Sequence, residues 1–450
     1  MKEQAEAERL AGDCNSKAAA VTSVVQTKKT EKAPALYDLT TLQRDANRLL
    51  GYTAQQTLDY LQSLYEKKLS TYPRTDSRYL TDDMEGGVNA LALCCAGVCG
   101  TEPPAAVCSG QVCSSKKVSD HHAVVPTMAA GETDLEALPA GEREILRLAA
   151  RQVLMAVSAP FVYLETEARL DCGGNALSAK GKTILHMGWR AYTEKGKQDN
   201  TLPELSEGQN FPNPAAKVTE HTTTPPKPHS EASLLSAMER AGNGDTDPDA
   251  ERRGLGTPAT RAAVIEKLVK GGFAERKGKQ LIPTQNGAAL ISVLPDMLTS
   301  PQLTAEWENN LTQIAKGAAD PGEFLSGIEA MARELVQTHA AALDGKKDLF
   351  REEKPSVGKC PRCGSPVHEG KKNYYCSNKE CAFVMWKNDR FFEERKTAFS
   401  AKIAAALLKS GKVNVKKLYS PKTGKTYDGT IVLADTGGKY VNYRIEVQKN

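Results

Sequence analysis

Residues 36–80 read LYDLTTLQRDANRLLGYTAQQTLDYLQSLYEKKLSTYPRTDSRYL. Leucines and other apolar side chains recur at helical spacing in two parts of this stretch, which predicts helices over residues 39–50 and 53–68. Thr53 is followed three residues later by Gln56, a pattern typical of a capping box at the start of the second helix. The helical pair ends just before the segment TYPRTDSR, where chemically useful side chains gather.

A tyrosine and an arginine lie two residues apart in that segment. Pro73 disfavours helical geometry at the residue before it, so we expect Tyr72 at a helix-to-loop transition. A phenol, with an ordinary pKa of about 10, becomes a nucleophile only when a cation or a base activates it. Arg74 supplies a permanent charge that could also hold a phosphate. A buried tyrosine beside a structural arginine is the alternative interpretation.

The segment SDHHAVVPT contains two adjacent histidines, His121 and His122, ahead of an apolar run. An imidazole there could donate a proton or a hydrogen bond to a phosphate oxygen. Two consecutive histidines also suit a turn whose hydrogen bonds are satisfied. The pair alone does not decide between these interpretations.

A Gly-rich loop precedes a predicted helix in GLGTPATRAAVIEKLVKGGF, residues 254–273. Thr257 suits the N-cap and Pro258 the first helical position, while Gly271 and Gly272 are expected to end the helix. The apolar side chains expected to face a core are Val264, Ile265 and Leu268.

The start of this helix has the composition of an anion-binding site. Thr260 and Arg261 fall in its first turn, after the glycines, and an exposed helix N-terminus favours negative charge. The following GKQLIPTQNG resembles a short β-wing, so residues 231–300 are expected to form a winged-helix DNA-binding unit. A plain capped helix is the alternative.

Four cysteines, Cys360, Cys363, Cys376 and Cys381, form the knuckles CPRC and CSNKEC with twelve residues between them. Four thiolates at this spacing suit a closed tetrahedral Zn²⁺ site in a zinc ribbon. Such a site leaves no open position for a water, so we expect the metal to hold the fold and to take no part in catalysis. A ribbon that keeps its cysteines without metal is the alternative.

Two further clusters, one of cysteines and one of acidic residues, are considered as metal sites. The run from Cys94 to Cys113 has irregular cysteine spacing and no histidine, so we expect a loop insertion with free thiols. GDTDPDAE lacks the glycine and glutamate positions of a calcium loop, which predicts a solvated acidic loop. Its acidic residues are Asp245, Asp247, Asp249 and Glu251.

The composition of the 450 residues, 40% hydrophobic and 25% charged, is that of an ordinary soluble protein of several domains. No apolar run is long enough to span a bilayer and the N-terminus lacks a signal peptide, so we expect a cytoplasmic protein with no membrane partner. The formal net charge is only +4, but residues 346–450 hold 23 Lys and Arg against 11 Asp and Glu. That balance suits a polyanion or, equally, a solvated charged surface.

The rest of the chain predicts alternating helix and strand. Residues 1–36 indicate a short helix and a polar, Lys-rich connector, and residues 141–158 an amphipathic helix. Residues 161–171 and 182–193 have strand-like alternation, and a Pro-rich segment follows them. The C-terminal residues predict a hairpin around TGG, with inward alternation at Val441, Tyr443, Ile445 and Val447.

The sequence closely resembles bacterial type IA DNA topoisomerases of the topoisomerase III kind. The likeness rests on four motifs in this order: TYPRTDSRYL, DHHAVVPT, GLGTPATRAAVIEKL and CPRC with CSNKEC. Residues 36–80 resemble the family's nucleophile segment nearly throughout, and the likeness runs from about residue 30 to the end. Residues 397–433 are similar to a small C-terminal repeat that some of these enzymes carry.

The resemblance implies roles for particular residues. Tyr72 matches the tyrosine that attacks single-stranded DNA, leaving a 5′-phosphotyrosine and a free 3′-hydroxyl without need of ATP. Arg74 matches the arginine beside the scissile phosphate, and His121 the histidine that assists there. Residues 257–261 match part of the groove for the strand; Lys270 would compensate for Gly271, where a basic residue is expected. The groove residues implied are Thr257, Pro258, Thr260, Arg261 and Lys270.

The resemblance also implies the fold class, a multidomain α+β protein whose mainly helical central domains form a ring with a β-rich arch segment. A zinc ribbon and a small α/β repeat follow. The expected domains are an arch or linker remnant (1–36), a tyrosine-bearing helical domain (37–160), a β-rich arch domain (161–230), a winged-helix-like groove domain (231–345), the ribbon (355–395) and the repeat (396–450).

One part of the family pattern has no counterpart in the sequence, namely the Toprim domain with its glutamate and its Asp-x-Asp-x-Glu cluster for Mg²⁺. Mg²⁺ is therefore expected for the family, but the residues that would bind it are not expected in this chain. We expect either an enzyme that is incomplete without a separate Toprim-containing chain, or a non-catalytic module that binds single-stranded DNA. In the second case the aromatic residues of the ribbon could stack on bases, although about half should form its core. These aromatics are Tyr374, Tyr375, Trp386, Phe391 and Phe392.

Overall fold

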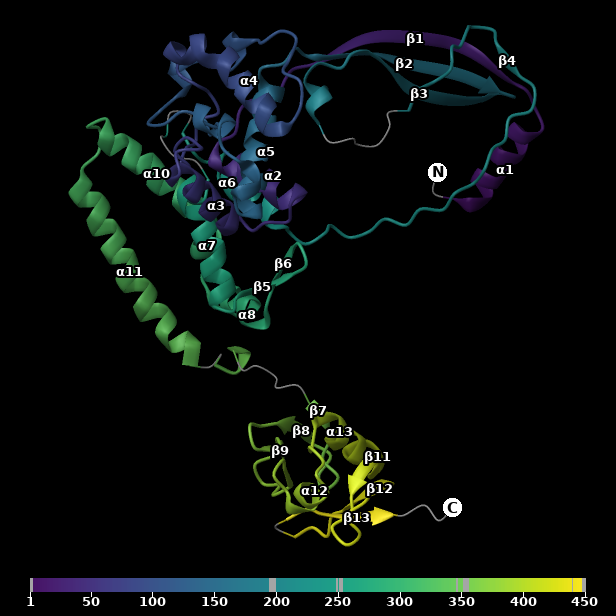
Figure 1. The fold of residues 1–450 in the computed structure, drawn as a ribbon, viewed down its shortest axis with the longest axis vertical. Coiled ribbons are helices and arrows are strands. Elements are labelled where there is room, and N and C mark those ends of the chain that lie inside the picture. The colour runs from purple at the N-terminus through teal and green to yellow at the C-terminus, as the bar shows by residue number, and fades with distance from the viewer. Residues whose placement is uncertain are drawn as a thin grey trace. The chain divides into compact units, whose positions relative to one another are not determined.

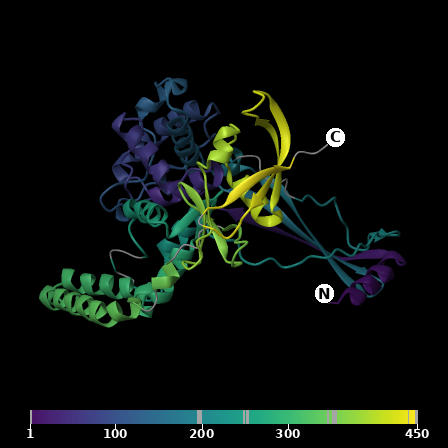
Figure 2. The same ribbon diagram turned by 90° about the horizontal axis from the view of Figure 1, so that it is seen from below.

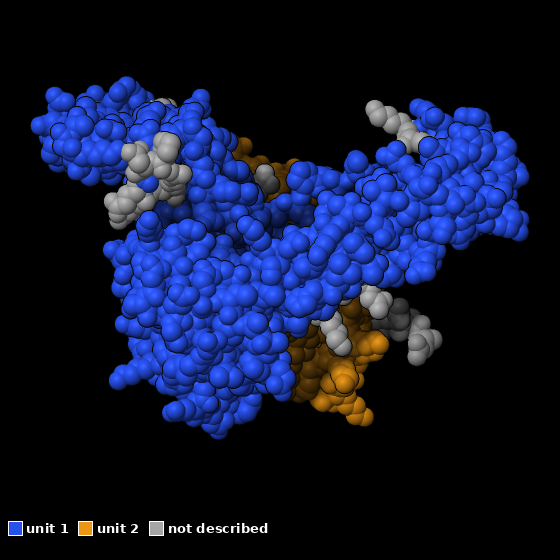
Figure 3. All heavy atoms as spheres, turned by 90° about the horizontal axis from the view of Figure 1, so that it is seen from above, with its two compact units in different colours: residues 1–350 blue, residues 351–450 orange. Residues whose placement is uncertain are grey.

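The computed structural model describes residues 3–193, 200–247, 250, 254–344, 347–350, 356–438 and 440–446. The chain divides into two compact units, residues 1–350 and 351–450, which Figure 3 colours separately. Each unit has a hydrophobic core of its own.

The largest core of the first unit lies among four helices, which Figure 1 shows packed together. They are α2 (Leu39–Leu49), α3 (Ala54–Glu66), α4 (Val88–Cys99) and α5 (Ala140–Ala156). The three helices predicted from periodicity are confirmed. So is the capping box of α3, in which the Gln56 backbone N–H donates to Thr53 Oγ1 at 3.1 Å and the Thr53 N–H donates to Gln56 Oε1 at 2.9 Å.

The cysteine run was predicted to be a loop, and this was wrong for its first part. Cys94, Cys95 and Cys99 lie on α4, where small apolar residues let the helix bury Cys95 completely. Burial raises the pKa of the Cys95 thiol. The thiols are free, as expected. Short 3₁₀ helices follow α3 and α4 in the chain: η1 (Asp82–Gly87), η2 (Ser109–Gln111), η3 (Ser115–Lys117), η4 (Met128–Gly131) and η5 (Leu135–Ala137).

A four-stranded antiparallel sheet extends from this helical body toward α1 (Gln4–Asn15), as Figures 1 and 2 show. Its spatial order is β3-β2-β1-β4, formed by β1 (Ala19–Glu31), β2 (Phe161–Cys172), β3 (Asn175–His186) and β4 (Asn210–Phe211). The expected Lys-rich connector is therefore wrong, because residues 19–31 pair with β2 along their length, from Ala19 opposite Cys172 to Glu31 opposite Phe161.

The second predicted strand also ends earlier than expected. β3 stops at His186, and the chain turns at Gly188, whose φ of +48° places it in the left-handed region. A Cβ there would meet the carbonyl oxygen of Pro160 at 2.2 Å. The turn starts η6 (Gly188–Tyr192), which packs beside α5.

A helical segment with a small wing follows the exposed connector after β4. It comprises α6 (Glu231–Arg240), α7 (Pro258–Lys270), the hairpin β5 (Ala274–Lys277) and β6 (Gln280–Pro283), and α8 (Gln285–Val293). The hairpin of β5 and β6 lies between α7 and α8 in the chain, and a winged-helix DNA-binding role for this segment stays a prediction. The expected core face of α7 is only partly correct, since Ile265 is buried while Val264 and Leu268 are exposed. The unit ends with α9 (Asp296–Thr299), α10 (Gln302–Ala315), α11 (Pro321–Asp344) and η7 (Lys347–Phe350).

The second unit joins two small sheets around one core. The first has the order β10-β9-β8-β7 and the second β11-β12-β13. Their elements are β7 (Ser356–Lys359), β8 (Pro366–Glu369), β9 (Asn373–Cys376), β10 (Val384–Trp386), α12 (Arg390–Glu394), α13 (Ala401–Ser410), β11 (Lys412–Tyr419), β12 (Thr426–Ala434) and β13 (Asn442–Glu446). The predicted C-terminal hairpin is present as β12 and β13; Val447 lies outside the described residues.

The ribbon and the C-terminal segment were predicted as separate domains, yet they share this core. The Phe392 ring stacks on Phe399 at a centroid distance of 4.1 Å and meets Tyr443 edge-on at 4.9 Å. The Arg362 guanidinium donates to both carboxylate oxygens of Asp435, at 2.8 and 2.6 Å. Residues of the ribbon and of the C-terminal segment therefore form one folded body.

Candidate active site

The loop that carries Tyr72 is fastened to a neighbouring segment by hydrogen bonds from its own threonines. The Thr71 N–H donates to the Val125 carbonyl and its hydroxyl to that of Ala123, both at 3.0 Å. The Thr75 hydroxyl donates to the carbonyl of His121 at 2.8 Å. These bonds bring the histidine segment alongside the tyrosine loop.

Burial alternates along this loop, as in a strand. Pro73, Thr75 and Ser77 are buried, whereas Tyr72 is half-buried and Arg74 exposed. The inward residues thus hold the backbone, and the outward residues are presented on the surface.

The Tyr72 ring lies between two other rings. Its centroid is 4.2 Å from that of His121, with the planes tilted by 38°, and Tyr65 meets it edge-on at 5.5 Å. The structure therefore brings together two of the three residues proposed for catalysis. The Arg74 Nη1 donates to Gln62 Oε1 on α3 at 3.3 Å, so this side chain is oriented by the helix that precedes the loop.

Sequence reasoning missed the contributions of Gln62 and Tyr65. Tyr65 is 41% exposed and packs against Tyr72. The two residues are three positions apart on α3, and residues at that separation share one helix face. That spacing is the signal that could have identified them.

His122 has a different environment from His121. Its Nδ1 lies 3.0 Å from the Ala123 carbonyl oxygen and the side chain is half-buried, whereas His121 is exposed. The satisfied-turn interpretation therefore fits His122, and a role of His121 toward phosphate stays a prediction. His122 is the satisfied turn residue, and His121 is the one that faces the tyrosine.

The start of α7 forms as predicted, with Thr257 as N-cap and Pro258 at the first helical position. The Thr260 hydroxyl accepts a hydrogen bond from the Thr257 N–H at 2.9 Å. Lys270 lies at the other end of this helix, about 18 Å away at 1.5 Å per residue. The structure therefore does not bring Lys270 together with the residues of the helix start.

Arg261 was expected in a DNA groove, and its placement does not fit that prediction. Only 3% of the residue is exposed; its Nε donates to the Leu255 carbonyl and its Nη1 to Thr40 Oγ1, each at 3.1 Å. Burial lowers the pKa of this guanidinium, while the Glu239 charge opposes that shift. Arg261 joins α7 to α2 and is occupied by these contacts.

The four cysteines of the ribbon gather as predicted, with their sulfur atoms all within 4.8 Å of one another. Cys360 and Cys381 Sγ are 3.7 Å apart, and Cys363 and Cys376 Sγ 3.4 Å. Four thiolates at about 2.3 Å from a zinc ion would be about 3.8 Å apart, so the cluster fits a tetrahedral metal. Hydrogen bonds, chiefly from Ser365, lower the pKa of Cys363 to about 6.

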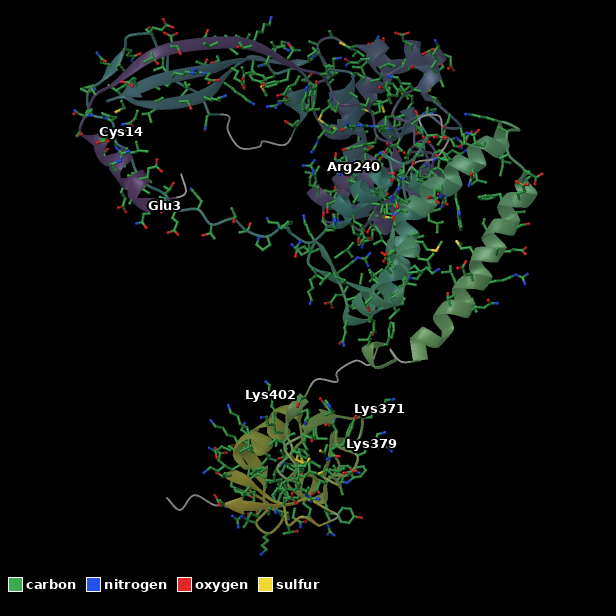
Figure 4. All side chains as sticks on the ribbon, turned by 180° about the vertical axis from the view of Figure 1, so that it is seen from behind. Glu3, Cys14, Arg240, Lys371, Lys379 and Lys402 are labelled. Carbon is green, nitrogen blue, oxygen red and sulfur yellow. The ribbon has the colours of Figure 1, made fainter. Side chains whose placement is uncertain are left out.

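The surface of the second unit carries lysines that point away from its core. Lys371, Lys379 and Lys402 are exposed, as Figure 4 shows. Of the aromatics proposed to stack on bases, Tyr374 and Phe392 are buried in the core, and Trp386 is exposed. The expected division of these rings between core and surface is therefore present.

The acidic loop has described residues that contact α10. The Asp247 N–H donates to Asn309 Oδ1 at 2.8 Å, and the Asn309 amide donates to the Asp245 carbonyl at 3.0 Å. Asp249 and Glu251 lie outside the described residues. Among the described residues, the ribbon cysteines are the one group of three or more metal-binding side chains close enough to share an ion.

The sequence pattern of the family described as DNA topoisomerase matches residues 1–326. The chain therefore belongs to this family, and within it to the type IA enzymes of the topoisomerase III kind. It is 35% identical to DNA topoisomerase 3 of Bacillus licheniformis over 401 residues and 36% identical to that of Bacillus subtilis over 404 residues. Each alignment covers 83% of this chain and 54% of the relative, so the chain spans about half the length of these proteins.

A solved structure supports the same fold. Full-length topoisomerase I from Thermotoga maritima superposes with a TM-score of 0.55 at 22% identity, covering 84% of this chain and 61% of that one. Among the described residues, no helix combines the length and the apolar character that crossing a membrane requires.

Proposed function

We propose that this chain cleaves and rejoins a single DNA strand, with the Tyr72 hydroxyl as nucleophile. Attack on a phosphodiester forms a bond from the phenolic oxygen to the 5′ phosphate and releases a 3′-hydroxyl. Attack by that hydroxyl on the phosphotyrosine restores the strand and frees Tyr72. Since the linkage keeps the energy of the broken bond, the cycle needs no ATP. Passage of another strand between the two steps changes DNA topology.

The observation that carries this proposal is the setting of the Tyr72 ring. It is fixed between His121 and Tyr65 on a loop whose inward residues are fastened by hydrogen bonds. A ring held in this way needs little reordering before attack, which lowers the entropic cost of reaching the phosphate. Family membership supports the choice of DNA as substrate.

Two neighbouring side chains suit the charges that develop in this reaction. Arg74 is exposed and its guanidinium can hold the non-bridging oxygens of the phosphate. His121, beside the tyrosine ring, can donate a hydrogen bond to the same phosphate.

The resemblance to type IA enzymes implies a Toprim domain and Mg²⁺. Mg²⁺ supplies neutralisation of the phosphate charge during transfer. We propose that a Toprim-containing polypeptide provides this part of the site to the present chain.

The second unit suits a structural zinc ion and a role in holding the strand. The geometry of the four sulfur atoms supports zinc, and the excess of lysine and arginine in residues 346–450 supports contact with phosphates. This basic unit also favours the second candidate function, a module that binds single-stranded DNA without cleaving it.

The test is trapping of a covalent adduct. The chain is incubated with 5′- and 3′-labelled single-stranded oligonucleotides and Mg²⁺, with and without a Toprim polypeptide from a related topoisomerase, and is then denatured. We expect adduct in the presence of the added polypeptide and none for Tyr72→Phe. Tyr65→Phe is the matched control, because it removes the neighbouring hydroxyl and keeps both rings, and it should still form adduct.

The outcomes separate the candidates. Adduct from the chain alone would contradict the need for a Toprim polypeptide. Equal loss in Tyr65→Phe and Tyr72→Phe would contradict the assignment of the nucleophile. Tight binding of the oligonucleotide with no adduct under any condition would favour the non-catalytic module.

A further inference from the structure

A second polar site lies in the first unit, in a pocket of about 470 Å³ between α2, α5, η6 and the segment before α2. Its lining carries four arginines and one acidic side chain, Asp45. The arginines are Arg44, Arg48, Arg78 and Arg151. None of the lining residues is Tyr72, Arg74 or His121, so this arginine pocket is distinct from the proposed catalytic site.

The two aromatic rings of the arginine pocket are held in place by hydrogen bonds. The Trp189 indole N–H donates to the Glu31 carbonyl at 3.2 Å, and the Tyr37 hydroxyl donates to Asp45 Oδ2 at 2.7 Å. Trp189 is half-buried, and it lines the pocket together with apolar side chains such as Leu148 and Met155. The pocket is therefore lined in part by a fixed aromatic ring, over which the Arg190 guanidinium also lies, 5.7 Å from the ring centroid.

Two arginines of the pocket, Arg44 and Arg48, have acidic neighbours and keep part of their side chains exposed. Arg48 contacts Asp45 at 2.8 Å, and Arg44 lies 3.8 Å from Glu239. The Arg48 side chain is nevertheless 64% exposed and that of Arg44 38% exposed. Lys279 adds a further cation near this surface, since its Nζ donates to the Arg48 carbonyl at 3.1 Å.

A fixed indole beside several guanidinium groups matches the two halves of a nucleotide. Arginine binds phosphate through paired N–H donors, and a base stacks on an aromatic face. A volume of about 470 Å³ is within the range of pockets that bind small molecules and can hold one nucleotide. An acidic peptide would use the arginines but would leave the indole without a stacking partner.

We propose that the arginine pocket binds one nucleotide unit of a single DNA strand, with its phosphate on Arg44 and Arg48 and its base against Trp189. The proposal rests on the proposed function only in taking DNA as the ligand. It adds a place where a strand is held away from Tyr72.

The experiment uses Trp189 as a local probe in the full chain. The chain has three tryptophans, so Trp307→Phe with Trp386→Phe leaves Trp189 as the sole emitter, and Tyr72→Phe removes cleavage. Octathymidylate is titrated while the fluorescence of Trp189 is followed. We expect saturable quenching, and weaker binding, by about tenfold or more, when Arg44→Gln and Arg48→Gln are added.

Salt dependence gives a second readout. Because Arg44 and Arg48 are proposed to hold one phosphate between them, the double substitution lowers the slope of log affinity against log salt by about 0.7. The matched control is Arg143→Gln with Arg147→Gln on α5. These arginines pair with Glu136 and do not line the pocket, so this variant should keep both the affinity and the slope. Thermal unfolding verifies that both double variants remain folded.

Several results would overturn the proposal. One is an unchanged Trp189 fluorescence while anisotropy shows that the oligonucleotide is bound. Another is an equal loss of oligonucleotide affinity in the control variant. Thymidine monophosphate that binds as tightly as the oligonucleotide would indicate a free-nucleotide site, and equal quenching by hexaglutamate would indicate an acidic peptide site. Because Tyr72 is absent from the assay, failure here is distinguishable from failure of the adduct test.

Discussion

Residues 71–77 divide two tasks between neighbouring side chains. Thr75 and Ser77 point inward and tie the loop to residues 117–127, while Tyr72 and Arg74 point outward. A strand-like alternation lets one short segment be anchored while it presents the side chains proposed for catalysis. A change at an inward residue should therefore weaken the attachment of the loop without altering the side chains proposed for catalysis.

Thr75→Val tests this division. The substitution keeps the shape of the side chain but removes the hydroxyl that donates to the His121 carbonyl and accepts from the Ser77 N–H. Both partners lose a hydrogen bond, so we expect the free energy of unfolding of the first unit to fall by about 1–3 kcal/mol. Urea unfolding measures the change. Asp76→Asn is the control, because this exposed side chain keeps an oxygen that can accept the hydrogen bond from the Ser119 hydroxyl, and an equal loss there would contradict the argument.

Helix α7 shows what local sequence can and cannot predict. Its start at Thr257 and Pro258 is set by hydrogen bonds within a few residues, and it was predicted correctly. The buried Arg261 side chain donates to Thr40, which is 221 residues away in the chain. A contact at that separation cannot be predicted from the local sequence pattern. The same holds for β1, which was missed because its partner strand begins at Phe161.

The candidate site divides in the same way. The residue types at Tyr72 and His121 were recognisable from their motifs, and the structure places their rings in contact. The role of Gln62 and Tyr65 comes from the packing of α3 against the loop, which the helical pattern alone did not reveal. The four cysteines needed no tertiary information, because their spacing alone fixes the knuckles.

At the scale of elements, the zinc ribbon and the strands after it are expected to respond together to loss of the metal. Cys376→Ser removes one of four thiolates, so we expect bound zinc to fall from about one equivalent to almost none at moderate chelator concentration. Because the core is shared, hydrogen-exchange protection should fall in β11–β13 as well as in the ribbon. Elemental analysis and exchange mass spectrometry measure the two effects. Protection lost in the ribbon alone would contradict a shared core.

The contact between Arg362 and Asp435 links the two sheets of this unit and predicts a pH dependence. The hydrogen bond from Arg362 lowers the pKa of Asp435 below its ordinary value. A carboxyl with a lowered pKa stabilises the fold above its unfolded pKa of about 3.9, and this contribution is lost as the pH falls through the folded value. The stability difference between the natural chain and Asp435→Asn should therefore shrink below about pH 4. A difference that stays constant from pH 6 to pH 3 would contradict this.

At the scale of the whole molecule, the two units have separate cores and should unfold separately. We expect calorimetry to show two transitions. Thr75→Val should lower only the transition of residues 1–350, and Cys376→Ser only that of residues 351–450. Trp307 and Trp386 report on the respective units by fluorescence. A single transition shifted by both substitutions would contradict independent units.

The pairing of Glu31 with Phe161 also bears on how the sheet of the first unit is joined to its helices. The chain leaves β1 for the helical body and returns from it into β2 at this one rung of the ladder, where the Glu31 carboxylate also binds Arg190 at 2.7 Å. Since η6, which follows β3, also packs beside α5, the sheet is joined to the helices at this end by several neighbouring segments of the chain.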